Sequence, residues 1–243
     1  MKKETSRYKE IDVARGIATL IMIAYHFSWD INYFVRNFEL PYSIWEYTSY
    51  AIASSFLLIV GISCYLESKK SPREENKKKY TKKILRTLLA ASVVTMSSLA
   101  FMSDRPIYFG ILHCIVVSYV LVGFFLKRSN KLSLATALFF IGIGIYFYLN
   151  PFRGFLLFWL IQSNFKIIMS DYLPLMPWFG IVLLGTLLGK KLLPLLEKRS
   201  KTPRPESSIT KILMFIGLHT LIIYLVHQPI MMGILQLLGL KEQ

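Results

Sequence analysis

The sequence predicts an all-α integral membrane protein, a bundle of about seven transmembrane helices. Hydrophobic residues make up 54% of the 243 positions and charged residues only 18%, whereas an average protein is about 45–50% apolar and about 25% charged. The charges are gathered in short blocks. The apolar runs between these blocks approach the roughly 20 residues of helix that cross a bilayer. This pattern excludes a soluble domain and a disordered chain.

Seven apolar segments are expected to span the membrane, and together they form one transmembrane domain over residues 1–243. The first segment has no A-x-A cleavage site after it, so it is expected to be retained and not removed as a signal peptide. In order along the chain, the segments are Ile11–Tyr33, Ile44–Leu66, Ile84–Met102, Ile107–Leu126, Leu132–Leu149, Leu175–Leu196 and Ile209–Leu238.

The distribution of basic residues predicts the topology of these segments. Twenty-three lysines and arginines lie on one side of the predicted bundle. They are in the N-terminus (1–10) and in three connections: second-to-third (67–83, continuing to Arg86), fourth-to-fifth (127–131) and sixth-to-seventh (190–209, continuing to Lys211). The opposite side carries five, and Arg15 lies inside the first segment. The positive-inside rule therefore puts the N-terminus in the cytoplasm and the C-terminus outside. The same rule explains the net charge of +15 without a nucleic acid partner.

The outer loop, residues 150–174, contains the apolar and aromatic stretch PFRGFLLFWLIQ (Pro151–Gln162). At about 12 residues it is too short to span a bilayer as a helix. A spanning role would also reverse the side on which the basic 190–211 region lies. We therefore expect an interfacial or re-entrant segment on the outer side.

Ionisable residues within the first segment are the strongest candidates for function, because charged groups are costly in hydrocarbon and usually face a cavity or a partner. At 100° per residue, one stripe of this helix carries Arg15, Thr19, Met22, His26, Asp30 and Tyr33. Arg15 lies near the cytoplasmic end, and His26 lies about 16 Å further along, in the outer half. Asp30, one turn beyond, is expected to hydrogen-bond the imidazole of His26 and fix its tautomer. A structural alternative stays open, in which His26 belongs to a buried polar network and Arg15 extends to lipid headgroups.

Two further histidines are expected at a depth similar to that of His26. His113 lies near the outer start of the fourth segment, and His227 lies in the outer half of the seventh, with Trp178 at the outer start of the sixth. His219 is expected nearer the middle of the membrane. No pair of histidines has the i, i+4 spacing typical of a metal site, so we expect no metal. Cys64 and Cys114 are expected near opposite faces of the membrane, which argues against a disulfide.

Several motifs carry a resemblance to known membrane acyltransferases. Arg15 and His26, with ten residues between them, resemble the R-x10-H signature of the acyltransferase-3 family. The chain as a whole more closely resembles the heparan-alpha-glucosaminide N-acetyltransferase catalytic-domain family. The matching pieces are ID-x-x-RG-IA (Ile11–Ala18), SSFLLIVGIS (Ser54–Ser63), FGILH (Phe109–His113), PWFGIVLLG (Pro177–Gly185) and GLHTLIIYLVHQPI (Gly217–Ile230).

The resemblance implies transfer of an acyl group, most simply acetyl, from cytoplasmic acyl-CoA to an extracytoplasmic glycan or amino sugar. The depth of the ionisable residues agrees with this reaction: we expect His26 to be the general base, oriented by Asp30, with Arg15 towards CoA and with His113, His227 and Trp178 at the acceptor end. In the heparan-modifying branch an asparagine stands at the position of His26, and the histidine usually assigned the role lies in the outer loop. This chain has no histidine from Phe27 to Leu112, so His26 is expected to take that role.

The predicted protein is therefore a multi-pass cell-membrane acyltransferase that uses acetyl-CoA and no metal. Its expected partners are acyl-CoA, an extracytoplasmic saccharide and the lipid bilayer, and a homodimer is left open. A small-solute transporter is an alternative, although no inverted repeat or matched pair of broken helices is visible. A non-enzymatic membrane subunit on the same scaffold is another. A retinal protein is disfavoured, because no lysine lies in the middle of a span for a Schiff base.

Overall fold

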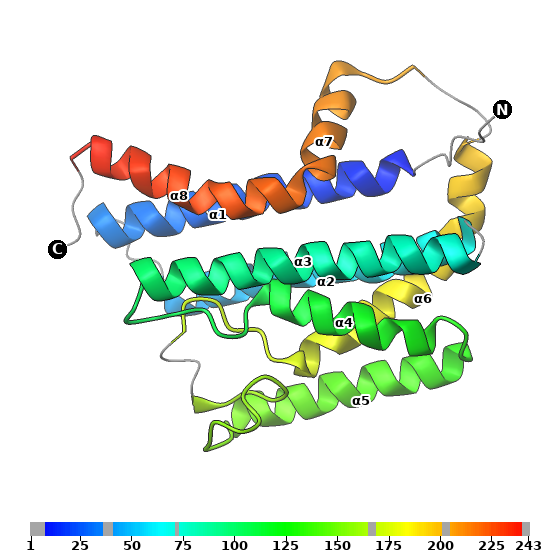
Figure 1. Ribbon diagram of the computed structural model, residues 1–243, viewed down its shortest axis with the longest axis horizontal. Helices are drawn as coiled ribbons and strands as arrows, with labels where there is room; N and C mark the ends of the chain where they lie inside the picture. The colour runs from blue at the N-terminus through cyan, green and yellow to red at the C-terminus, as the bar shows by residue number, and fades with distance from the viewer. Residues whose placement is uncertain (1–7, 36–40, 71–72, 165–168, 201–204, 240–243) are drawn as a thin grey trace. The chain divides into compact units, whose positions relative to one another are not determined.

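The computed structural model describes residues 8–35, 41–70, 73–164, 169–200 and 205–239, and over these residues it is all-helical apart from loops and one isolated β-bridge. The predicted all-α architecture is confirmed (Figure 1). The helices are α1 (Lys9–Val35), α2 (Tyr42–Lys70), α3 (Arg73–Phe101), α4 (Ile111–Phe125), α5 (Asn130–Leu149), α6 (Leu175–Ser200), α7 (Ser208–Leu218) and α8 (Thr220–Leu237).

Six of the described helices contain a stretch long and apolar enough to cross a membrane, namely α1, α2, α3, α5, α6 and α8. The described helices α4 and α7 are apolar but shorter. Large apolar side chains remain on helix surfaces, such as Leu89 at 68% exposed and Leu138 at 58%. Such exposure would be unfavourable in water but is expected where the surrounding solvent is lipid. The chain is a multi-pass membrane protein.

Three of the predicted segments differ from the helices that form. The third was expected from Ile84, but α3 begins at Arg73, so most of the predicted 67–83 loop is helical. The fourth was expected from Ile107, but α4 begins only at Ile111, because residues 102–110 form an irregular turn in which Ser98 Oγ accepts a hydrogen bond from the Ile107 N–H. The seventh was expected to be one helix, Ile209–Leu238, and this is wrong. It is two helices, α7 and α8, which meet at His219, where φ and ψ are −104° and 10°. Figure 1 shows the change of direction between them.

The chain divides into two compact units. One comprises Ser6–Phe56 and Ser200–Gln243, and so contains α1, the first half of α2, α7 and α8. We call it the terminal unit, because it joins the two ends of the sequence. The other comprises residues 57–199 with the rest of α2 and α3 to α6, and we call it the central unit.

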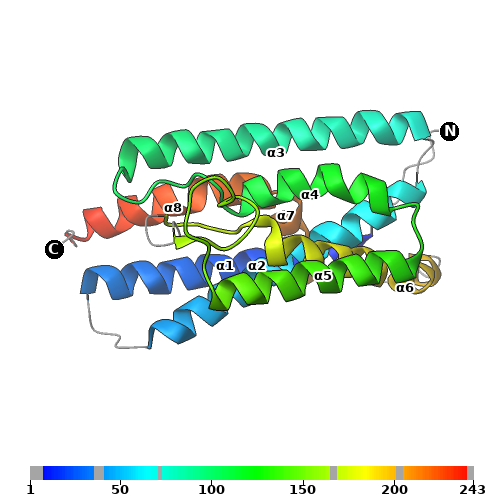
Figure 2. The same cartoon turned by 90° about the horizontal axis from the view of Figure 1, so that it is seen from below.

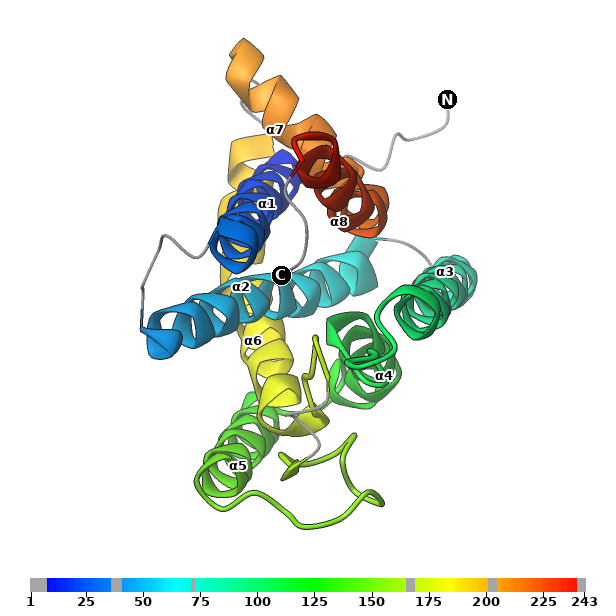
Figure 3. The same cartoon turned by 90° about the vertical axis from the view of Figure 1, so that its left-hand side faces the viewer.

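In the terminal unit, α1 packs closely against α7 because two glycines leave room for backbone contact. A Cβ on Gly217 of α7 would overlap the backbone carbonyl of Asp12, and a Cβ on Gly16 of α1 would overlap that of Leu213. Small residues let apolar helices approach each other in this way within membranes. Helix α8 then continues alongside α1, as the end-on view in Figure 3 shows.

In the central unit, α3 and α4 lie side by side (Figure 2). Helices α2 and α6 approach through glycines, because a Cβ on Gly61 would overlap the Val182 carbonyl and one on Gly185 would overlap the Leu58 carbonyl. Helix α5 meets α6 where Gly180 faces Ala137 and Ile141. These contacts give the unit a tightly packed centre that includes Phe179 and Leu183, both 1% exposed or less.

The described part of the loop between α5 and α6, which was predicted to be extracytoplasmic, folds around the buried Tyr172. Its hydroxyl lies 2.6 Å from the Phe158 carbonyl and 2.9 Å from the Ile161 carbonyl, and it accepts the Ser163 N–H at 3.1 Å. Burial raises the pKa of Tyr172, so the phenol stays protonated and can donate to either carbonyl. The aromatic stretch is not a spanning helix, and it leaves Phe155 and Leu156 exposed.

Candidate functional site

The polar stripe predicted on α1 faces α7 and α8. Thr19 is fully buried and its hydroxyl lies 3.0 Å from that of Thr220 in α8. One turn earlier, Arg15 Nη1 lies 3.4 Å from the Gly217 carbonyl at the end of α7. The stripe therefore lies between helices and is not directed entirely at lipid. The side chain of Tyr33, its last predicted member, lies outside the described residues.

At the end of α1 that is predicted to be cytoplasmic, Arg15 forms an ion pair with Asp12. Nη1 lies 3.0 Å from Oδ1, and the Asp12 side chain is 4% exposed. A buried carboxylate of this kind needs a cation close to it. Arg15 thus has a structural task in the terminal unit, and Asp12 offsets the positive charge that Arg15 offers to an anionic ligand.

Near the other end of the stripe, the imidazoles of His26 and His227 are in contact. Their ring centroids lie 4.9 Å apart with the planes at 66°. His26 comes from α1 and His227 from α8, 201 residues later in the chain. Of the histidines predicted at similar depth, these two are brought together, and we call them the histidine pair.

Backbone carbonyls set the tautomer of both members of the histidine pair. His26 Nδ1 lies 2.9 Å from the Met22 carbonyl, and His227 Nδ1 lies 2.7 Å from the Tyr224 carbonyl. A carbonyl oxygen only accepts, so each Nδ1 carries the proton. In a neutral imidazole the other nitrogen, Nε2, is then the base. The sequence assigned this orienting task to a carboxylate, but in the structure the histidines' own helices perform it.

Asp30 does not make the hydrogen bond to His26 that the sequence predicted. Its two carboxylate oxygens each accept from Gln228 Nε2 at 3.0 Å. The physical reason is the neighbouring helix: α8 brings the amide of Gln228 to the buried carboxylate, and His26 Nδ1 is already bonded to Met22. Asp30 therefore fixes the amide of Gln228, whose oxygen must point away from the carboxylate.

Three buried polar atoms of the terminal unit have no hydrogen-bond partner among the described residues: His227 Nε2, Gln228 Oε1 and Trp45 Nε1. His227 is 9% exposed and Trp45 is 8% exposed. Buried polar atoms are usually hydrogen-bonded, so each such group calls for an explanation, and a bound ligand is one. Two of these atoms are acceptors beside the histidine pair, and they suit a ligand that donates hydrogen bonds.

Aromatic residues adjoin the histidine pair on α1 and α2. The Tyr25 ring lies 5.3 Å from the imidazole of His26 and 5.8 Å from the indole of Trp45. The Tyr25 hydroxyl also donates to the Trp45 carbonyl at 3.1 Å. Trp29 packs edge-to-face on Trp45 at 5.3 Å. This packing holds the later part of α1 against the start of α2.

His113, predicted at the acceptor end, belongs to the central unit and uses both ring nitrogens there. Nδ1 accepts the Gly110 N–H at 3.2 Å, so Nε2 carries the proton and lies 3.2 Å from Thr95 Oγ1. Asp171 accepts the neighbouring Ile111 N–H at 3.0 Å. His113 and Asp171 together cap the start of α4, which is a structural role for this histidine.

The remaining predicted residues lie in α6 and at the junction of α7 and α8. Trp178 is buried in α6 of the central unit at 7% exposed. His219 stands at the junction of α7 and α8, with Nδ1 2.8 Å from the Phe215 carbonyl. Within the described residues, no three His, Cys, Asp or Glu side chains gather as a metal site would require. Cys64 and Cys114 are buried free thiols.

Sequence reasoning missed Gln228 and Trp45. Gln228 directly follows His227 in the GLHTLIIYLVHQPI motif, and a polar residue in an apolar helix is itself a signal of function. Its partner could not be read from the sequence, because Asp30 lies 198 positions away. Trp45 gave no signal, since a tryptophan near the end of a span usually marks the membrane interface.

Comparison with known proteins assigns the chain to a family. No curated protein matches the chain, and no solved structure matches it. A family model described as "Heparan-alpha-glucosaminide N-acetyltransferase, catalytic" matches residues 7–229, which includes both members of the histidine pair and every helix from α1 to α7. This family indicates a transmembrane acetyltransferase. A match over most of the chain shows that the protein belongs to the heparan-alpha-glucosaminide N-acetyltransferase catalytic-domain family.

Proposed function

We propose that the protein transfers an acetyl group from cytoplasmic acetyl-CoA to an amino or hydroxyl group of a saccharide on the extracytoplasmic side. The observation that carries this proposal is the histidine pair, in which backbone hydrogen bonds leave Nε2 of His26 and of His227 as bases. Family membership supplies the class of reaction. The positive-inside distribution of charge supplies the direction.

In the proposed reaction, His26 is the general base. Its Nε2 takes the proton from the acceptor N–H or O–H while that atom attacks the thioester carbonyl carbon. The carbon–sulfur bond breaks, and the departing CoA sulfur receives the proton from His26, so the products are the acetylated saccharide and free CoA. Proton transfer of this kind contributes about 10²- to 10⁴-fold in rate.

His227 and Gln228 would hold the acceptor. The unpartnered His227 Nε2 and Gln228 Oε1 can each accept a hydrogen bond from a saccharide hydroxyl or amine. Asp30 acts through Gln228, because its two hydrogen bonds to the amide nitrogen determine where the amide oxygen points. Asp30 is therefore a positioning residue in this proposal.

Arg15 lies on the donor side of the same α1 stripe. Eleven residues of helix separate it from His26, a distance of about 16 Å that the pantetheine arm of CoA would cross. Because Asp12 pairs with it, Arg15 is expected to contribute less to the binding of phosphate than an isolated cation would.

Release of free CoA measures the reaction directly. We expect purified protein in detergent to release CoA thiol from acetyl-CoA when a saccharide acceptor is present, and the mass of the acceptor to rise by one acetyl group. Glucosamine and glucose, compared at equal concentration, distinguish amine from hydroxyl acylation. Thermal stabilisation by transported ions or solutes, with none by acetyl-CoA and no thiol release, would instead favour the transporter.

A further inference from the structure

The two atoms that would hold the acceptor are covered by protein in the structure. His227 Nε2 and Gln228 Oε1 are buried and have no hydrogen-bond partner within the described part of the chain. The His227 side chain is 9% exposed, and Asp30, which holds the Gln228 amide, is 5% exposed. A saccharide is much larger than a water molecule, so it reaches these atoms only if part of the terminal unit moves.

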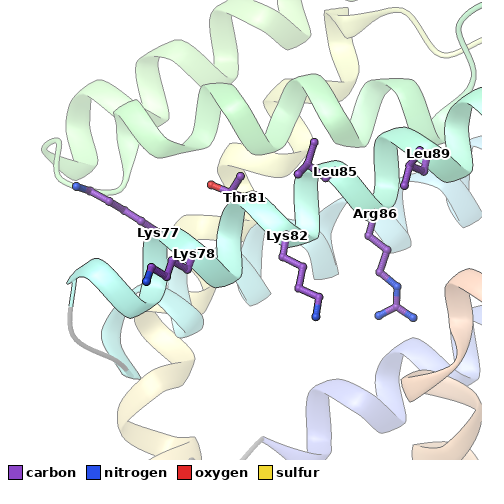
Figure 4. A pocket seen from close by; sticks show the side chains of 7 residues that line it. All are labelled: Lys77, Lys78, Thr81, Lys82, Leu85, Arg86 and Leu89. Atoms are coloured by element: carbon purple, nitrogen blue, oxygen red, sulfur yellow. The ribbon is translucent and has the colours of Figure 1, made fainter.

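A hollow on the surface of α3 does not provide this access. Its volume is about 600 Å³, and its lining lies between Lys77 and Leu89, with Lys82 and Arg86 among the side chains around it (Figure 4). All of these residues belong to the central unit, whereas the histidine pair belongs to the terminal unit. The helices whose separation would expose the two acceptor-binding atoms are those that carry the histidine pair, α1 and α8.

Helix α7 is held on α1 by contact between the two backbones. A Cβ on Gly217 would overlap the Asp12 carbonyl, and one on Gly16 would overlap the Leu213 carbonyl. Such close packing is typical of helix pairs that associate tightly in membranes. Because Gly217 is the penultimate residue of α7, the contact holds this helix almost to its end.

Helix α8 is joined to α1 through side chains. Near its start, the hydroxyls of Thr19 and Thr220 lie 3.0 Å apart. Further along, the rings of the histidine pair meet, and Gln228 donates to Asp30. A Cβ on Gly233 of α8 would meet no atom within 4 Å, unlike the glycines between α1 and α7. Side-chain contacts can separate while both helices keep their backbone hydrogen bonds, so α8 can leave α1 more easily than α7 can.

The junction at His219 is a suitable pivot for α8. Its φ of −104° and ψ of 10° interrupt the helix, and residues at the ends of helices are the ones that absorb hinge movements. His227 lies eight residues further on, about 12 Å along α8. A tilt of about 20°, which is ordinary for transmembrane helices, would move His227 by about 4 Å. Non-bonded carbon atoms lie about 3.5–4.0 Å apart, so this movement makes room for atoms of a ligand.

We infer that α8 is a gate for the acceptor: it pivots at His219 while α7 stays packed on α1, and this movement opens His227 and Gln228 to the saccharide. The inference rests on the proposed function, which assigns the acceptor to these two residues. The same movement separates His227 from His26. The general base and the acceptor-binding residues therefore come together only when α8 closes over the bound saccharide, which also excludes water from the reaction.

The first test measures opening without any reaction. His227→Cys places a thiol on the gate, and Thr19→Cys is the matched control, because Thr19 is fully buried between the same helices but next to the pivot. We expect a small water-soluble methanethiosulfonate to add one group to His227→Cys in the full-length protein in detergent, as read from the intact mass. Thr19→Cys and the buried native thiols Cys64 and Cys114 should stay unmodified. An unmodified His227→Cys, or modification of Thr19→Cys at the same rate, would overturn the gate.

The second test holds α8 against α1 during turnover. Asp30→Cys with Gln228→Cys, in a chain whose two native cysteines are replaced by alanine, is joined by a bifunctional methanethiosulfonate that a phosphine reductant cleaves. Formation of acetylated glucosamine at saturating glucosamine should fall in proportion to the cross-linked fraction and should return on reduction. The same link between Thr19→Cys and Thr220→Cys, beside the pivot, should not lower turnover. A monofunctional methanethiosulfonate on each variant controls for the bulk of the reagent.

The outcomes distinguish failure of the gate from failure of the proposed function. Cross-linked protein that acetylates glucosamine as fast as reduced protein would overturn the gate and leave the function standing. An equal loss with the monofunctional reagent would also overturn it, because bulk and not restraint would then block the site. A chain that opens in the first test but never acetylates glucosamine would support the movement of α8 and count against the function.

Discussion

The replacement of His26 by glutamine separates a catalytic role from a structural one. The imidazole contributes two things in the structure: an Nδ1–H that bonds the Met22 carbonyl at 2.9 Å, and an unprotonated Nε2 beside His227. A glutamine amide can donate the first hydrogen bond. It cannot take up a proton, so only the second contribution is lost.

The two roles predict losses of different size. One neutral hydrogen bond contributes about 1 kcal/mol, and glutamine keeps most of it, so a structural role predicts nearly normal turnover. Loss of a general base costs about 10²- to 10⁴-fold in kcat. At about 1.36 kcal/mol for each factor of ten, that is about 2.7 to 5.4 kcal/mol of activation free energy.

The assay is release of CoA thiol under saturating acetyl-CoA and acceptor, with binding of acetyl-CoA measured separately. His219→Gln is the matched control, because His219 makes the same hydrogen bond to a carbonyl four residues earlier, at 2.8 Å to Phe215. We expect normal acetyl-CoA binding in both variants and a loss of turnover only in His26→Gln. Near-normal turnover in folded His26→Gln would refute the assignment. A greater loss in His227→Gln than in His26→Gln would move the base to α8.

Three further predictions test the surroundings of the site. Gln228→Met removes the amide that Asp30 holds. It should raise KM for the acceptor about tenfold, which corresponds to about 1.4 kcal/mol, and leave KM for acetyl-CoA unchanged. Equal effects on the two KM values would contradict an acceptor role. Gly217→Ala places a methyl group against the backbone of Asp12 and should cost about 1–3 kcal/mol of stability in thermal unfolding, whereas Gly233→Ala in open space should cost nothing. For topology, a membrane-impermeant thiol reagent should label Asn164→Cys in intact cells and Arg128→Cys only after permeabilisation. The native cysteines are buried and should not react with the reagent. Labelling of both variants from one side would contradict the predicted orientation.

The sequence by itself determined the class of fold and the polar side of α1 that faces α7 and α8. Apolar runs of spanning length leave few choices in a bilayer, because every backbone group must be hydrogen-bonded within its own helix. Helical periodicity is equally local, so the stripe through Arg15, Thr19 and His26 followed from 100° per residue. The family motifs likewise pointed to an acetyltransferase, and the family match confirmed that resemblance.

Only the tertiary structure decided which side chains meet across helices. Asp30 and His26 are one turn apart on α1, yet Asp30 pairs with Gln228 of α8, because a neighbouring helix offers a better-placed donor than the next turn does. The break at His219 was also hidden, since both halves of the segment are apolar and no proline stands at the junction. Contacts between residues 200 positions apart depend on how helices pack, and helix packing is set by shape at positions such as Gly16 and Gly217, which hydropathy alone does not reveal.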